Sequence, residues 1–244
     1  GEWIVPADSG SAFVYRHLDD SWVLEAELNS GLEAQQNEFL GYSVAVSGRH
    51  VAAGLPDWSA NGVRVGAVRV FWLSDDGWTA ETMLRHQGTE SWNLGCSLAL
   101  WENTMVAGAR GGLGDAFVYV LNEDGWVQRD RLSAPEGDTN TGFGHAVAMW
   151  EEWIAVSAIW GVNDGNPSGA VHLYRQVGEE WIHVERLSSP ELDKAGAFGD
   201  QLAMAGGRLL ISDPAADAPE QDSGVAWLYD LNAKNAATAW SRYP

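Results

Sequence analysis

The chain has 244 residues, 45% of them hydrophobic, so it is long and apolar enough to bury a sizeable core, and extended disorder is not expected. Its 34 acidic and 14 basic residues give a formal net charge of −20, which repels phosphate backbones and anionic lipids and argues against nucleic acid as a partner. The single cysteine, Cys96, excludes an internal disulfide and a Cys-based metal cluster. Neither a leader nor a run of 18 apolar residues is visible, so membrane insertion is not expected; because the chain begins at Gly1, we expect a processed or excised piece.

Three short segments open the chain: apolar runs at residues 3–7 and 11–15, and a stretch that contains Trp22 and Leu28. Each is bounded by turn residues and is predicted to be a strand. The same three segments recur in every later part of the chain, where a further strand precedes them. The N-terminal unit is therefore predicted to lack its first strand.

The first complete unit begins near residue 39. Its first predicted strand covers residues 40–46 and starts with a Leu-Gly pair; after a tight turn the second covers residues 51–56. A variable loop leads to the third, residues 66–71, whose apolar alternation ends in Phe71. Trp78 follows seven residues later and Leu84 six further on, in the fourth predicted strand.

This unit recurs along the whole chain. Gly41, Gly95, Gly144 and Gly199 are separated by 54, 49 and 55 residues, and their surroundings align without gaps. Such a period dictates the architecture. The last unit is irregular, because Trp240 stands eleven residues after Tyr229 instead of seven. We assign one domain, residues 1–244, made of a partial unit (1–38) and units 39–92, 93–141, 142–196 and 197–244.

Four short antiparallel strands cannot bury both of their faces alone, so these units must stack, and the predicted fold is an all-β propeller of four-stranded antiparallel blades. The Phe/Leu-Gly, Gly-Leu-Pro or Gly-Ala, Gly-Ala-Val-x-Val-Phe and Trp segments resemble FG-GAP repeats, which the integrin α-subunit head and many bacterial surface proteins share. The resemblance covers nearly the entire chain. It implies that the Phe-Gly strand is innermost and the Trp strand outermost. About five repeats are visible, in a five-bladed ring or in part of a larger ring.

The resemblance also raises the question of calcium. Integrin-type blades hold it on an Asp-x-Asp-x-Asp-Gly loop between the first and second strands. The corresponding turns here, residues 47–50, 101–104, 150–153 and 205–208, are too short and too poor in Asp, so no cofactor or metal is expected there. Two oxygen-rich loops, residues 163–166 and 213–222, could instead bind calcium. Loops of this composition are more often ordinary polar turns.

No motif of catalysis is present. The six histidines have no ligand spacing, and the sequence has neither a Gly-x-Ser-x-Gly elbow nor a phosphate-cradling loop. The chain is therefore predicted not to be an enzyme. A polysaccharide-active propeller stays open as an alternative, because catalytic carboxylates in a propeller need no local motif.

Two groups among the 14 tryptophans bear on packing and on ligand binding. Trp22, Trp78, Trp126 and Trp181 recur at one position of the unit and are assigned to packing between blades. The others considered, Trp58, Trp92 and Trp160, do not recur and lie in loops that open on one face of a propeller. Exposed aromatic rings there could stack on sugars or anchor a protein; the alternative is that these loops pack on themselves. With the charged neighbours of these loops, the predicted ligand-binding residues are Trp58, Trp92, Trp160, Asp57, Arg110 and Asp164.

The leading hypothesis is therefore a secreted or cell-surface recognition or adhesion module that binds a glycan or a protein through its loop face. The alternative is a structural subunit of a cell-surface assembly or filament. In that case the incomplete first blade would mediate self-association or receive a strand from a neighbouring chain.

Overall fold

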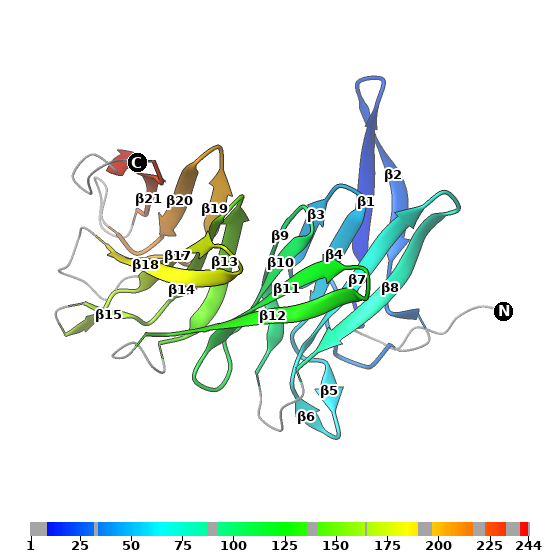
Figure 1. Ribbon diagram of the computed structural model, residues 1–244, viewed down its shortest axis with the longest axis horizontal. Helices are drawn as coiled ribbons and strands as arrows, with labels where there is room; N and C mark the ends of the chain where they lie inside the picture. Colours follow the sequence, from blue (N-terminus) through cyan, green and yellow to red (C-terminus); the bar gives the residue numbers. More distant parts are fainter. Residues whose placement is uncertain are drawn as a thin grey trace.

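The computed structural model describes residues 9–31, 34–86, 92–135, 141–163, 165–189, 197–216, 223–232 and 240–243. The 22 secondary-structure elements in these ranges are all β-strands (Figure 1). Within the described ranges there is no helix long and apolar enough to cross a membrane. The predicted all-β class is confirmed.

Four antiparallel sheets of four strands follow a two-stranded hairpin. The hairpin consists of β1 (Ala12–Leu18) and β2 (Ser21–Leu28). The first sheet contains β3 (Val44–Ser47), β4 (His50–Leu55), β7 (Ala67–Ser74) and β8 (Gly77–Arg85). The second contains β9 (Leu94–Trp101), β10 (Thr104–Ala109), β11 (Asp115–Asn122) and β12 (Gly125–Ser133). The third contains β13 (Phe143–Trp150), β14 (Trp153–Ala158), β17 (Ala170–Val177) and β18 (Glu180–Ser188). The fourth contains β19 (Leu202–Ala205), β20 (Arg208–Asp213), β21 (Val225–Asp230) and β22 (Trp240–Tyr243).

Two small hairpins extend the variable loops between the second and third strands of a blade. They are β5 (Ser59–Ala60) with β6 (Val63–Arg64), and β15 (Val162–Asn163) with β16 (Asn166–Pro167). The periodicity did not predict these hairpins, because neither is part of the repeating unit.

The sheets are blades of a propeller, stacked side by side in chain order (Figure 1). The strand with the Phe/Leu-Gly pair lies at one edge of each sheet and its outermost partner at the other, and β3, β9, β13 and β19 are neighbours in series. The β1–β2 hairpin is the outer half of the same unit. Its register shifts between Val14 and Tyr15, at the repeat position where β7, β11 and β17 also carry a β-bulge.

Each of the first three blades buries two different faces. We call the face that packs on the preceding unit the leading face; it carries the aromatic residue near the middle of the third strand, such as Phe71 or Tyr119. The opposite, trailing face carries small aliphatic residues such as Val68 and Val70, which pack against the leading face of the next blade. A core between blades therefore forms at every junction, which is why the units are stable only in a stack.

Adjacent blades approach closely at the glycine of the Phe/Leu-Gly pair. Gly144 has φ +85°, and a Cβ atom there would lie 2.2 Å from the carbonyl oxygen of Asp115 in the preceding blade. Only glycine tolerates both the left-handed backbone and this approach. The Gly of the predicted Phe-Gly pair is therefore the residue that lets blades stack.

The outer tryptophans follow the prediction in the complete blades. Trp126 and Trp181 are buried between blades, and Trp78 packs at the edge of the first core. For Trp22 the prediction is wrong, because its side chain is 70% exposed. No described unit precedes the β1–β2 hairpin to cover it. In the fourth blade, Trp240 pairs with Tyr229 and starts the short strand β22.

Candidate functional site

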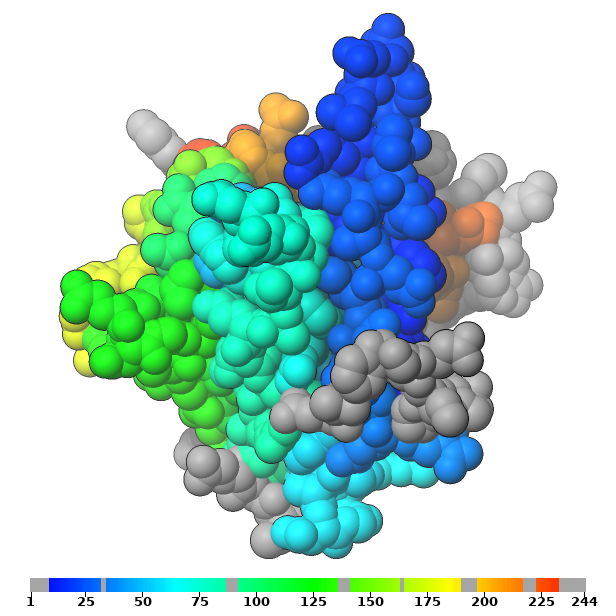
Figure 2. Space-filling view, turned by 90° about the vertical axis from the view of Figure 1, so that its right-hand side faces the viewer, coloured from blue at the N-terminus to red at the C-terminus, as the bar shows by residue number. Residues whose placement is uncertain are grey.

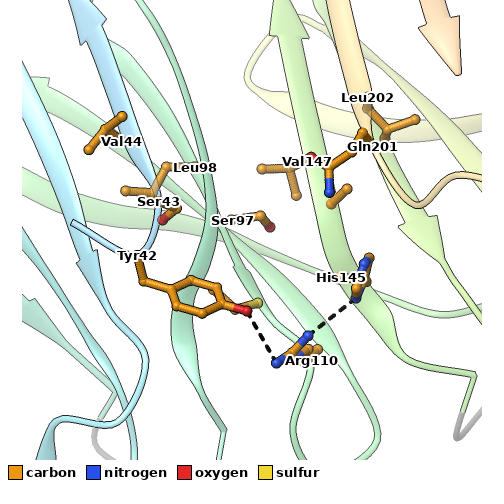
Figure 3. Close-up of a pocket in the computed structure, with 12 residues that line it drawn as sticks. Tyr42, Ser43, Val44, Ser97, Leu98, Arg110, His145, Val147, Gln201 and Leu202 are labelled. Atoms are coloured by element: carbon orange, nitrogen blue, oxygen red, sulfur yellow. Dashed lines mark hydrogen bonds between the residues drawn. The ribbon is translucent and has the colours of Figure 1, made fainter. Parts of the chain in front are cut away.

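A cavity of about 410 Å³ opens between the innermost strands of the four blades (Figure 3). The repeat position directly after the Phe/Leu-Gly pair supplies Tyr42, Cys96 and His145 from three successive blades to its lining. Arg110, which follows β10, completes the polar side, and the phenol ring of Tyr42 points toward it in Figure 3. The fourth blade lines the far side with Gln201 and Leu202.

These polar groups form a connected chain. Arg110 Nη1 lies 3.4 Å from His145 Nδ1, and Arg110 Nη2 lies 3.5 Å from the hydroxyl oxygen of Tyr42. His145 Nε2 lies 3.2 Å from Asp200 Oδ1. Because a guanidinium only donates hydrogen bonds, Nδ1 of His145 must accept, and the ring proton therefore sits on Nε2, where it is donated to Asp200. This series of hydrogen bonds fixes both the tautomer of His145 and the position of Arg110.

Hydroxyl groups hold the inner strands together beneath this chain. Ser43 Oγ donates a hydrogen bond of 2.7 Å to the carbonyl of Gly95, and Ser97 Oγ donates one of 3.1 Å to the carbonyl of Gly144. The same interaction thus joins the first blade to the second and the second to the third. The polar residues of the cavity stand on a rigid base, which favours recognition of a ligand with little rearrangement.

Cys96 belongs to that base. Its Sγ lies 3.3 Å from the carbonyl oxygen of Gly144, and burial raises the pKa of the thiol because the thiolate would lose its hydration. We expect Cys96 in the folded protein to react with an alkylating reagent far more slowly than in the protein unfolded in guanidinium, at a pH of about 8. Mass spectrometry of timed samples measures both rates. Equal rates would show that the thiol is accessible.

The structure buries two of the predicted ligand-binding residues. Trp58 is buried between the β1–β2 hairpin and the first blade, and the guanidinium carbon of Arg85 lies 4.6 Å from its ring centroid. Trp92 is buried between the first and second blades, with its ring centroid 6.1 Å from that of Phe117. For Trp58 and Trp92 the structure therefore favours the alternative, in which the tryptophan packs inside the protein. These loops differ in length between blades, yet each still needs a large apolar residue to cover the core.

The other predicted site residues have different environments. Trp160 is 60% exposed in the loop after β14, so its expected exposure is confirmed. Asp57 is engaged by its neighbours: Arg64 Nη1 lies 3.4 Å from its Oδ2, and Asn93 Nδ2 donates to its Oδ1 over 3.4 Å. Arg110 lines the cavity. Asp164 lies outside the described residues. A ligand-binding role for the exposed members stays a prediction.

Sequence reasoning missed Tyr42, His145 and Asp200. The signal that could have found them is the repeat itself. The Phe/Leu-Gly pair recurs in all four blades, whereas the next residue is Tyr, Cys, His or Asp. A position that keeps its place near the axis but changes its chemistry from blade to blade is a candidate for ligand contact.

The described part of the chain contains no group of three or more His, Cys, Asp or Glu side chains placed to hold a metal ion. The second oxygen-rich loop, residues 213–222, falls largely outside the described ranges.

Comparison with protein families agrees with this geometry. The FG-GAP repeat family matches residues 126–174, which run from the last strand of the second blade to the third strand of the third blade. The chain therefore contains an FG-GAP repeat, within a fold made of repeated four-stranded sheets. FG-GAP repeats form β-propellers, are common in extracellular and surface proteins, and belong to a typically non-enzymatic family. The matched unit is offset from the structural blade, because it ends one blade and begins the next.

Proposed function

We propose that this protein is a non-catalytic extracellular recognition or adhesion module, which binds a glycan or a protein partner on its loop face with the axial cavity as the centre of contact. The observation that carries the proposal is the chain Tyr42–Arg110–His145–Asp200, assembled from all four blades at the cavity.

Arg110 is the group that would recognise the ligand. A guanidinium has five N–H donors, and the contacts with Tyr42 and His145 use two nitrogen atoms of it without occupying every donor. The free donors suit the oxygen acceptors of a sugar or a carboxylate. In a protein with a net charge of −20, a cation held in place at the cavity provides a local attraction for an acidic or oxygen-rich ligand.

Trp160 supports the same face. The loops after β10 and β14 are equivalent in neighbouring blades, so Arg110 and Trp160 lie on the same side of the propeller. An exposed indole on the same side as a polar cavity supplies the apolar surface on which a sugar ring or an aromatic side chain stacks. A flat aromatic contact and a directed polar contact together would define one ligand orientation.

A glycan array probed with the purified chain tests the proposal. We expect Arg110→Ala to weaken binding by about 10-fold or more, because hydrogen bonds from a charged donor are lost, and Trp160→Ala to weaken it less. Arg175→Ala is the matched control. It removes the same charge beside Glu152 at the hairpin between β13 and β14, on the opposite face, and should leave binding unchanged.

Two results would contradict the proposal in different ways. Binding that survives Arg110→Ala and Trp160→Ala would place the ligand elsewhere on the molecule. No binding to any glycan would exclude sugars, and the same variants then test protein ligands by surface-coupled capture of extracellular receptor domains.

A further inference from the structure

The two ends of the blade series expose faces that every other blade buries. At the hairpin end, Phe13 and Tyr15 are each 55% exposed, and Trp22 is 70% exposed. The counterparts of Tyr15 in the next blades, Phe71 and Tyr119, are buried. These three residues are the leading face of the β1–β2 hairpin, and no described residue of the chain covers them.

The opposite end exposes a trailing face. Leu210 in β20 is 41% exposed, whereas its repeat counterparts Ala52, Val106 and Ala155 are fully buried. Ala226 and Leu228 in β21 are partly exposed. Their counterparts in the first blade, Val68 and Val70, are fully buried against the second blade. The fourth blade therefore presents the aliphatic surface that normally receives a leading face.

These two faces are complementary by construction. At each internal junction an aromatic leading face packs on an aliphatic trailing face, and the chain exposes one of each. They lie at opposite ends of the series in Figure 1, and Figure 2 shows the hairpin at the near surface with the C-terminal blade behind the other blades. One molecule in this arrangement cannot satisfy both faces.

We propose that a second copy of this chain docks head to tail, with its fourth blade placing Leu210, Ala226 and Leu228 against Phe13, Tyr15 and Trp22. The contact continues the blade stack across two molecules. A groove of about 530 Å³, lined by Phe13 and Tyr15 of β1 and by the exposed Val44 and Val46 of β3, borders it on the axial side. Because the two surfaces differ, the interface is heterologous, and repeated docking gives a ring or a filament.

The net charge of the protein determines how association depends on salt concentration. Two molecules of charge −20 repel each other at long range, so association should strengthen as salt rises. We expect the purified chain to form dimers and larger species with rising concentration at an ionic strength of about 0.15 M, where the Debye length is about 8 Å. Sedimentation velocity and light scattering measure this. A chain that stays monomeric at every concentration would overturn the proposal and leave the faces to a different partner.

Two single variants test the direction of docking. Phe13→Glu disables the leading face and Leu210→Glu the trailing face, and each should raise the apparent dissociation constant by about a hundredfold, because docking would bury an unpaired carboxylate. Both side chains are exposed, so folding should be preserved, as circular dichroism can verify. Ile182→Glu is the control: this exposed residue of β18 lies on neither end face, and its variant should associate normally.

Mixing the variants gives the decisive result. Phe13→Glu retains a sound trailing face and Leu210→Glu a sound leading face, so an equimolar mixture should form a dimer that stops at two molecules. If Leu210→Glu associates like the unmodified chain, the leading faces pair with each other and the head-to-tail arrangement is wrong. A mixture that stays monomeric while the unmodified chain associates would overturn it equally.

Discussion

Replacement of Gly144 by alanine is expected to lower the free energy of unfolding by about 2–5 kcal/mol. The left-handed backbone contributes about 1–2 kcal/mol to this loss, because a Cβ atom clashes with the chain itself. The approach of the second blade contributes about 1–3 kcal/mol more, because backbone atoms of Asp115 and Ala109 would lie 2.2 and 3.0 Å from the new carbon atom. Urea unfolding followed by tryptophan fluorescence measures the change.

Gly178→Ala separates the two causes. Gly178 also has a positive φ, +65°, but a Cβ atom there would meet nothing within 4 Å. This variant should therefore show only the backbone penalty, about 1–2 kcal/mol. If both variants lose the same stability, contact between blades at Gly144 is not tight, and the stacking mechanism derived from it would fail.

The fold could be predicted from the sequence because residues that recur in each repeat occupy the same packing position in each blade. The spacing of Gly41, Gly95, Gly144 and Gly199 placed one innermost strand per blade, and the Trp and Leu positions placed the outer strands. A residue that recurs does so because each blade meets the same neighbour. Trp22 shows the limit of this reasoning: it has the sequence of a packed residue, but no described blade stands on that side, so its ring is exposed.

The candidate site was less predictable, because ligand contacts need not repeat. Trp58 and Trp92 were considered for ligand contact because no tryptophan recurs at their positions in the other blades. Each instead packs in the core of one junction between units. Arg110 was identified only as a charged neighbour of the loops. Its partner His145 comes from the next blade, 35 residues later, and no local spacing relates the two. Convergence at the axis depends on how blades are arranged around it, which a single unit does not encode.

Arg131→Met is expected to destabilise the protein by about 3 kcal/mol, because it leaves a buried carboxylate without its cation. Asp115, the first residue of β11, is 1% exposed. Its Oδ1 accepts hydrogen bonds from Arg131 Nε at 2.9 Å and from Ser133 Oγ at 2.5 Å, and its Oδ2 accepts one from Arg131 Nη2 at 2.8 Å. Methionine keeps much of the length of the side chain, which also packs over Trp92, so the lost charge dominates the effect.

Asp115→Asn in the same chain tests this cause. Alone, this variant should lower the free energy of unfolding by about 1–2 kcal/mol, since Arg131 is about half exposed and water can solvate its guanidinium. Combined with Arg131→Met it should recover stability relative to Arg131→Met alone, because no buried charge then remains, and the double-mutant cycle should give a coupling energy of about 1–3 kcal/mol. Strictly additive losses would mean that water already solvates Asp115 in the folded protein.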